Sequence, residues 1–284
     1  MNIKDFSDAE LNGRVSYSTW RKNASSMTTT ANAWYDLTYI YGTNNFNYNT
    51  TPLTSKVLRY STHGGMNVGP NITTNKYLRS TTIISVTTAP ITFILCDYLM
   101  YYPFVQENTF SAQTMINSQV LSRYVDGIGV KIMAVSYSNN RNGNATFVVN
   151  YTNELGISGR TASGLTNTAI GFGNIITSTS VVASSIYVGS YGPFLTLQDL
   201  DKGVRSIQGV RMNNIDIGTF NLILVKPLAE TQIRGIDAPV EKDYFLETGT
   251  VPEIKNDACL DWICLPTASI ASNILIGDIK TIWT

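Results

Sequence analysis

The sequence predicts an all-β protein, an antiparallel β-sandwich or jelly roll with a few short helices and long loops. Short runs rich in β-branched and aromatic residues, such as residues 129–136 and 145–151, recur along the chain. The segments between these runs are rich in Thr, Ser, Asn and Gly, which favour turns. Residues 277–283 alternate apolar and polar side chains, the period of a strand with one buried face.

The pattern of these runs gives the elements in chain order. We expect a short helix at residues 5–11 and a final strand at 277–283. Residues 240–246 are a helix candidate, and residues 257–264 fit a helix or a strand equally. Pro227 lacks the amide donor of a ladder and is expected to end the strand before it. The remaining strands are expected at residues 15–18, 34–40, 56–60, 80–85, 91–99, 129–136, 145–151, 185–188, 203–210 and 220–225.

One pair of these strands carries a hairpin signal. Residues 139–144 contain Asn-Gly and lie between the strands at 129–136 and 145–151. Asn and Gly adopt positive φ at low cost, and tight hairpin turns require positive φ. The sequence therefore predicts that these two strands pair with each other.

Size and composition indicate one folded unit. The chain has 284 residues, of which 43% are hydrophobic and 14% are charged. This balance is typical of a chain that buries a core rather than of a disordered one. No internal repeat of ~20–50 residues occurs. We expect a single β-rich domain over residues 1–284, with residues 1–30 as a candidate N-terminal arm.

Charge and cysteine content limit the partners and the compartment. Lys and Arg number 20, as do Asp and Glu, so no net charge attracts nucleic acid or an anionic membrane. The three cysteines have no paired spacing, which indicates assembly in a reducing cytoplasm. The N-terminus is polar, and no apolar stretch reaches the ~18 residues of a membrane helix. We expect neither nucleic acid nor a membrane as a direct partner.

The sequence offers few groups for catalysis. His63 is the single histidine and has no G-x-S-x-G nucleophile motif to serve. The acids Asp97, Asp126, Glu154, Asp216, Glu230, Asp237 and Glu241 are scattered. A glycosidase needs only two acids at a fixed separation, so this class stays open as an alternative. We predict that the chain is not an enzyme and has no cofactor.

Metal binding has one candidate. Asp199 and Asp201 resemble the opening of a calcium loop, but the third acid and the closing Glu are missing. The main interpretation of this segment is a turn between strands, and we predict no metal site.

Six blocks that span most of the chain carry a family signal: residues 34–37, 123–130, 151–160, 203–207, 222–228 and 257–262. As a set, and in the expected order, they resemble a family of tailed-bacteriophage virion structural proteins. The resemblance implies a particle-bound protein of the capsid decoration or minor capsid type. Such a protein is assembled in the bacterial host cytoplasm, and its partners are the major capsid protein or other virion proteins. No catalytic residue carries over.

The expected work of such a subunit is to contact its neighbours, and Tyr-rich strands suit that role. We expect a homo-oligomer, a trimer or a ring. Arg205 and Arg211 have even spacing and are candidates for one contact stripe, or for an ordinary solvated strand face. Aromatic candidates, each with burial in the core as the alternative, are Tyr101, Tyr102, Phe104, Tyr187 and Tyr191.

Three other functions remain open. A neck, collar or tail component would have the same general character. A glycan- or receptor-binding module, or a depolymerase, would instead place exposed aromatic residues and paired acids around a groove. A host-derived soluble β protein of unrelated role would show the same lack of recognisable chemistry.

Overall fold

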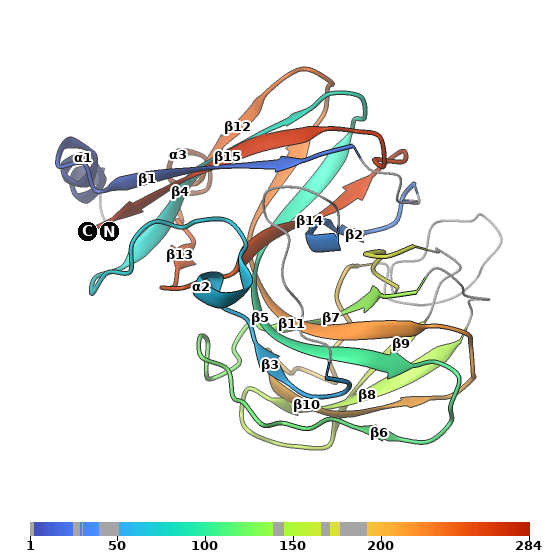
Figure 1. Ribbon diagram of the computed structural model, residues 1–284. Helices are drawn as coiled ribbons and strands as arrows, with labels where there is room; N and C mark the ends of the chain where they lie inside the picture. Colours follow the sequence, from blue (N-terminus) through green and yellow to red (C-terminus); the bar gives the residue numbers. More distant parts are fainter. Residues whose placement is uncertain are drawn as a thin grey trace.

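The protein is built almost entirely from antiparallel strands, as predicted (Figure 1). The computed structural model describes residues 3–24, 29, 31–39, 51–138, 145–165, 171–176 and 192–284. Its helices are short: α1 (Ile3–Leu11), α2 (Tyr60–His63), α3 (Tyr244–Thr248) and the 3-10 helix η1 (Leu37–Tyr39). Every strand pairing within the three sheets is antiparallel across the described residues. The fold class expected from the sequence is therefore confirmed.

Three sheets form two sandwiches that share their middle layer. The upper sheet has the order β1 (Val15–Lys22), β15 (Leu275–Trp283), β4 (Lys76–Ser85) and β12 (Val240–Asp243), and β13 (Glu253–Ile254) also pairs with β4. The central sheet has the order β2 (Tyr35–Asp36), β14 (Leu260–Pro266), β5 (Ile91–Gln106), β11 (Thr219–Ile233) and β7 (Lys131–Ser136), and β3 (Lys56–Val57) also pairs with β5. The lower sheet has the order β6 (Gln113–Thr114), β10 (Val204–Met212), β8 (Thr146–Asn153) and β9 (Arg160–Leu165).

Two long strands connect the sandwiches. β5 and β11 pair along their whole length, from Ile91 opposite Ile233 to Gln106 opposite Thr219, with three register shifts. Register shifts of this kind bend a strand pair and increase its twist. Figure 1 shows the pair running from the upper sheet into the lower half of the molecule.

The hydrophobic core divides along β5. Phe93 and Leu95 pack in an upper core beneath the upper sheet, where Phe93, Trp20 and Trp262 form a ring cluster with centroids 6.0–6.5 Å apart. Tyr102 and Val105 of the same strand pack in a lower core against the lower sheet. A third cluster holds Cys96, Tyr98 and Tyr101 with Trp34, Leu58 and Ile175 from other segments. The central sheet is therefore covered on both faces, which accounts for its nearly continuous apolar strands.

The predicted hairpin does not form. β7 pairs with β11 in the central sheet, whereas β8 pairs with β10 and β9 in the lower sheet. Ile132 and Ala134 of β7 and Phe147 and Val149 of β8 all pack in the lower core. The two strands therefore stack across the core instead of pairing edge to edge, because each finds a longer partner elsewhere. The expected turn, residues 139–144, lies outside the described residues.

Pro227 does not end its strand, contrary to expectation. β11 continues to Ile233, and a register shift falls between Pro227 and Ala229. A bulge is a position where a missing ladder donor costs little, so the strand passes through proline.

Several element predictions need correction in type. Residues 34–40 form only the two-residue strand β2, followed by η1, and Ile40 lies outside the described residues. Residues 240–246 begin as β12 and turn helical only at Tyr244, where the Asp243 side chain accepts the amide of Leu246. Residues 257–264, left open from sequence, belong mainly to β14. The strand expected at 185–188 lies outside the described residues.

The first 30 residues do not form a free arm in their described part. β1 pairs with β15 over eight residue pairs, from Val15 opposite Ile282 to Lys22 opposite Leu275. The Lys22 ammonium is buried and donates to the carbonyl oxygens of Ala271 and Asn273, at 3.0 and 2.6 Å. The N-terminal segment is thus an integral strand of the upper sheet.

Candidate functional site

Three loops converge at the point where β10 begins, at one end of the lower sandwich. They are residues 121–130, residues 154–159 between β8 and β9, and residues 196–203. Backbone hydrogen bonds join the first and third loops: Gly129 N donates to Lys202 O at 2.9 Å, and Val204 N donates to Gly127 O at 3.1 Å. A Cβ on Gly203 would collide with the Gly127 carbonyl, so only glycine allows this close approach.

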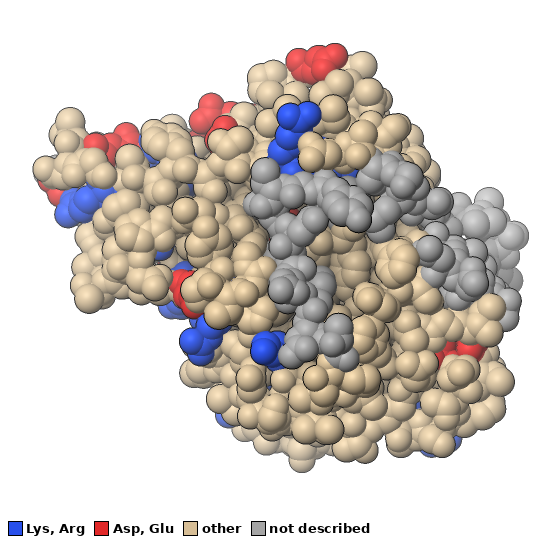
Figure 2. Space-filling model, viewed as in Figure 1, with Lys and Arg blue, Asp and Glu red and all other residues tan. Residues whose placement is uncertain are grey.

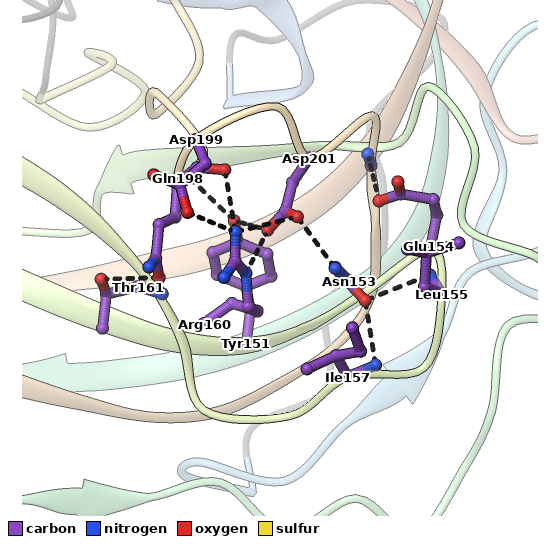
Figure 3. Close-up of polar contacts among 11 residues, drawn as sticks. Tyr151, Asn153, Glu154, Leu155, Ile157, Arg160, Thr161, Gln198, Asp199 and Asp201 are labelled. Carbon is purple, nitrogen blue, oxygen red and sulfur yellow. Dashed lines mark hydrogen bonds and ion pairs between the residues drawn. The ribbon is translucent and has the colours of Figure 1, made fainter.

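A carboxylate, Asp201, organises the polar side of this site (Figure 3). Arg160 donates to it through Nε at 2.8 Å and through Nη2 at 3.1 Å, and Nη2 also reaches Asp199 at 2.9 Å. The Tyr151 hydroxyl donates to Asp201 at 2.6 Å and the Asn153 amide at 2.8 Å. The loop at 196–203 is thereby tied to β8 and β9.

The electrostatics of this network follow from those contacts. Hydrogen bonds from Arg160 first, then from Tyr151 and Asn153, lower the pKa of Asp201 to about 2 despite partial burial. Burial first, and then the hydrogen bond to Asp201, raises the pKa of Tyr151 to about 12. At neutral pH the network therefore holds a carboxylate, a guanidinium and a neutral phenol.

The arrangement argues against the calcium alternative for Asp199 and Asp201. Asp201 uses both carboxylate oxygens to accept donors, and the guanidinium of Arg160 lies where a cation would bind. Calcium needs six to eight oxygen ligands, most of them free of such donors. Among the described residues, no cluster of His, Cys, Asp or Glu has the arrangement of a metal site. The segment acts as a fastened turn, the main interpretation from sequence.

Arg205 links the second loop to the first. Its Nη2 donates to the Glu154 carbonyl at 2.5 Å, and its Nε donates to the Asp126 carbonyl at 3.2 Å. The Glu154 side chain in turn accepts the Gly203 amide at 3.1 Å. The candidate contact residue Arg205 is thus exposed, but it also holds two loops together.

The structure divides the other candidate contact residues. Arg211 is exposed on β10, as Arg205 is. Tyr101 and Tyr102 are only 1% and 0% exposed, so they belong to the core. Phe104 is partly buried, with its ring 4.7 Å from that of Tyr137. The remaining two, Tyr187 and Tyr191, lie outside the described residues.

The seam between the two cores carries an ion pair that sequence reasoning missed. Asp97 lies on β5 between Leu95 of the upper core and Leu99 of the lower core. Arg123 donates to both Asp97 oxygens, at 2.9 and 2.8 Å, and to the Leu58 and Tyr98 carbonyls, each at 3.0 Å. Burial opposes the charge on Arg123, but Asp97 more than offsets it and raises the pKa of the guanidinium.

A second contact holds the same loop from its other end. The Lys226 ammonium on β11 donates to the Ile128 carbonyl at 3.0 Å and lies 5.4 Å from the centre of the Tyr124 ring. Arg123 and Lys226 together anchor residues 121–130 to the two long strands.

Two further acids, Asp36 and Asp261, are buried in the central sheet. Burial raises the pKa of Asp36 to about 6, although Tyr98 Oη donates to it at 2.7 Å and Thr38 N at 3.0 Å. Burial, together with the charge of Asp36, raises the pKa of Asp261 well above its ordinary value. No sequence signal distinguishes these acids from turn acids, because their burial depends on distant segments.

The groups considered for catalysis have structural contacts. His63 Nδ1 lies 3.1 Å from the Arg59 amide and 2.7 Å from the Thr62 hydroxyl, and burial lowers the pKa of this histidine. Among the acids, Asp97 lies in the seam and Glu154 binds a loop amide. The absence of enzymatic activity remains an expectation from the sequence. No helix among the described residues is long and apolar enough to cross a membrane.

Charge is dispersed over the face in Figure 2. Lys, Arg, Asp and Glu appear there as separate small groups among other residues, with no extended area of one sign. This distribution agrees with the equal numbers of acidic and basic residues.

Comparisons with known proteins identify no family. No family model matches the chain, and no curated protein matches it. Solved structures of infectious bursal disease virus particles are among the neighbours found. The alignment with the T=1 particle structure has 8% sequence identity and a TM-score of 0.19, and it covers 95% of this chain and 77% of the viral chain. The alignment with the VP2 subviral particle also has 8% sequence identity, with a TM-score of 0.17, and it covers 95% of this chain and 80% of the viral chain. Scores this low do not demonstrate a shared fold.

Proposed function

We propose that this chain is a structural subunit of a tailed-phage particle that binds the capsid and stabilises the shell. The observation that carries the proposal is the convergence of three resemblance blocks at one place. Residues 123–130, 151–160 and 203–207 contribute to the three loops at the start of β10, although they are far apart in sequence. Three of the six blocks that resemble virion proteins thus meet at one surface of the molecule.

The character of this surface suits a protein contact. The described loops expose aliphatic side chains and are fixed by hydrogen bonds to the framework. A rigid apolar surface loses little conformational entropy on binding, which favours a permanent contact between subunits. Many such contacts of modest strength, repeated over a shell, stabilise it through multivalency.

Binding to empty capsids tests the proposal directly. Purified chain is mixed with empty capsids of its phage, and co-sedimentation is measured at increasing protein concentration. Saturable binding, together with a higher temperature of capsid disruption, is the expected result. Binding only to isolated tails or necks would move the protein to that part of the particle, and binding only to host glycans would replace the structural role with receptor recognition. Either result would overturn the capsid assignment.

A further inference from the structure

The three loops carry five exposed aliphatic residues between them. Val125 and Ile128 lie on the first loop, Leu155 and Ile157 on the second, and Leu200 on the third. Their exposed fractions run from 51% for Ile128 to 91% for Leu200. We name these five side chains the loop patch. Single exposed aliphatic residues are ordinary, whereas a monomer's largest apolar patch is often an interaction site.

The loops are neighbours by direct contact. Ile128 forms a backbone bridge with Gly203, three residues after Leu200. Asn153 Oδ1 accepts the amides of Leu155 and Ile157, at 3.1 and 2.9 Å, while its Nδ2 donates to Asp201. Figure 3 shows Asn153 between Asp201 and the turn that carries Leu155 and Ile157. The patch is therefore fixed in place by the same network that positions Asp201.

We infer that the loop patch is the surface through which two copies of this chain associate. This inference goes beyond the proposed function, because it names a second copy of the chain, rather than the capsid itself, as the occupant of the loop surface. Such a dimer would form whether or not a capsid is present. The occupant we assign is a second copy related by two-fold symmetry, so that each patch contacts the other.

The size of the patch fits that occupant. Side chains exposed to this extent together present on the order of 500 Å² of apolar surface, near the upper end of the range for a monomer's largest patch. A standard interface buries about 800 Å² on each partner, of which roughly 60% is apolar. The patch thus supplies about the apolar area that one side of a standard dimer needs.

The loops that carry the patch also carry charges of both signs. Asp126 and Asp199 provide acids, whereas Lys202 and Arg205 provide bases, on the same three loops. A two-fold contact between identical surfaces needs both signs, so that an acid of one copy can face a base of the other. The equal numbers of acidic and basic residues in the chain also leave no net repulsion between copies.

The experiment is sedimentation-velocity centrifugation of the full chain across a concentration series, without capsids. The wild type is expected to form a reversible dimer. Leu200→Asp places a charge in the apolar contact and is expected to raise the dimer Kd at least about tenfold. Leu246→Asp is the matched control: Leu246 is 69% exposed on α3, in the upper half of the molecule, and its substitution should leave the Kd unchanged.

A cross-link provides a second readout that does not depend on weakening the contact. All three native cysteines are buried, so Leu155→Cys introduces one accessible thiol. A short bis-maleimide is expected to trap a covalent dimer of this variant, and not of a Leu246→Cys variant.

A wild type that stays monomeric at high concentration, or a dimer that Leu200→Asp leaves intact, would overturn the inference. A trimer or ring insensitive to Leu200→Asp would do the same. Circular dichroism on each variant separates loss of the dimer from loss of the fold. Capsid co-sedimentation, measured separately, decides the proposed function independently of this result.

Discussion

Removing the cation from the seam ion pair should be among the most destabilising single changes in this protein. In Arg123→Met the aliphatic part of the side chain is kept, but Asp97 is left buried without its partner. Its side chain is 0% exposed and that of Arg123 only 5%. Among the described residues, the hydrogen bond from the Cys259 amide, at 3.0 Å, would still reach Asp97.

The magnitude follows from those contacts. Four hydrogen bonds from Arg123 are lost, two to Asp97 and two to the Leu58 and Tyr98 carbonyls. Breaking a buried pair by removing one partner costs about 3–5 kcal/mol of unfolding free energy. Asp97→Asn should cost a similar amount, because it leaves the guanidinium buried and uncompensated. The double variant removes both charges, so its loss should fall at least ~2 kcal/mol short of the sum of the single losses.

Urea denaturation of the four proteins at pH 7 measures these free energies. Lys255→Met is the control: Lys255 and Glu253 pair at 2.7 Å but are 38% and 39% exposed, so its cost should stay below ~1 kcal/mol. The reasoning that this pair fastens the loop to β5 would be refuted by either of two results. One is a small loss of unfolding free energy in Arg123→Met and in Asp97→Asn; the other is a loss in the double variant that equals the sum of the two single losses.

Three further changes test other parts of the structure. The pKa of Asp36 is raised to about 6 in the folded protein, so this carboxyl ionises at a lower pH in the unfolded chain, and stability falls between about pH 4 and pH 6. Asp36→Asn should remove this fall and stabilise the protein at pH 8 by up to ~3 kcal/mol. Melting temperatures of the two proteins that change in parallel over pH 4–8 would contradict this prediction. The pKa of Asp201 is lowered to about 2, so the stability that this carboxylate contributes is present above about pH 4 and is lost as the pH falls toward 2. Asp201→Asn should therefore weaken the loss of stability with acid, which circular dichroism measures from pH 5 to pH 2. An acid dependence equal to that of the wild type would show that Arg160 does not favour the ionised form. Gly277→Ala should cost about 1–3 kcal/mol, because its Cβ would lie 2.7 Å from Trp20 Nε1 and closer still to the Thr82 carbonyl; a thermal melt equal to wild type would mean that the Trp20 ring has room to move.

The sequence was informative where structure is local. Residues 277–283 alternate over one strand, and that strand, β15, was placed correctly. The Asp199–Asp201 segment was interpreted as a turn, and the structure has the same arrangement, closed by Arg160. In each case neighbouring residues carry the whole signal.

It failed where the outcome depends on distant partners. The Asn-Gly turn predicted pairing of β7 with β8, but β11 and β10 compete successfully for those edges. Tyr101 and Tyr102 were contact candidates, and both are buried because both faces of the central sheet are covered. The Asp97–Arg123 pair joins residues 26 positions apart, and no spacing rule connects a strand acid with a loop arginine.

The two long strands also determine where the molecule can be divided. Because β5 and β11 supply residues to the upper core and to the lower core, no cut between the two sandwiches leaves either one with a complete central sheet. The halves should therefore melt in a single cooperative transition, despite having separate cores. A partner bound at the lower loops would then protect the upper sheet, and with it both chain termini, from proteases that act on the unfolded state.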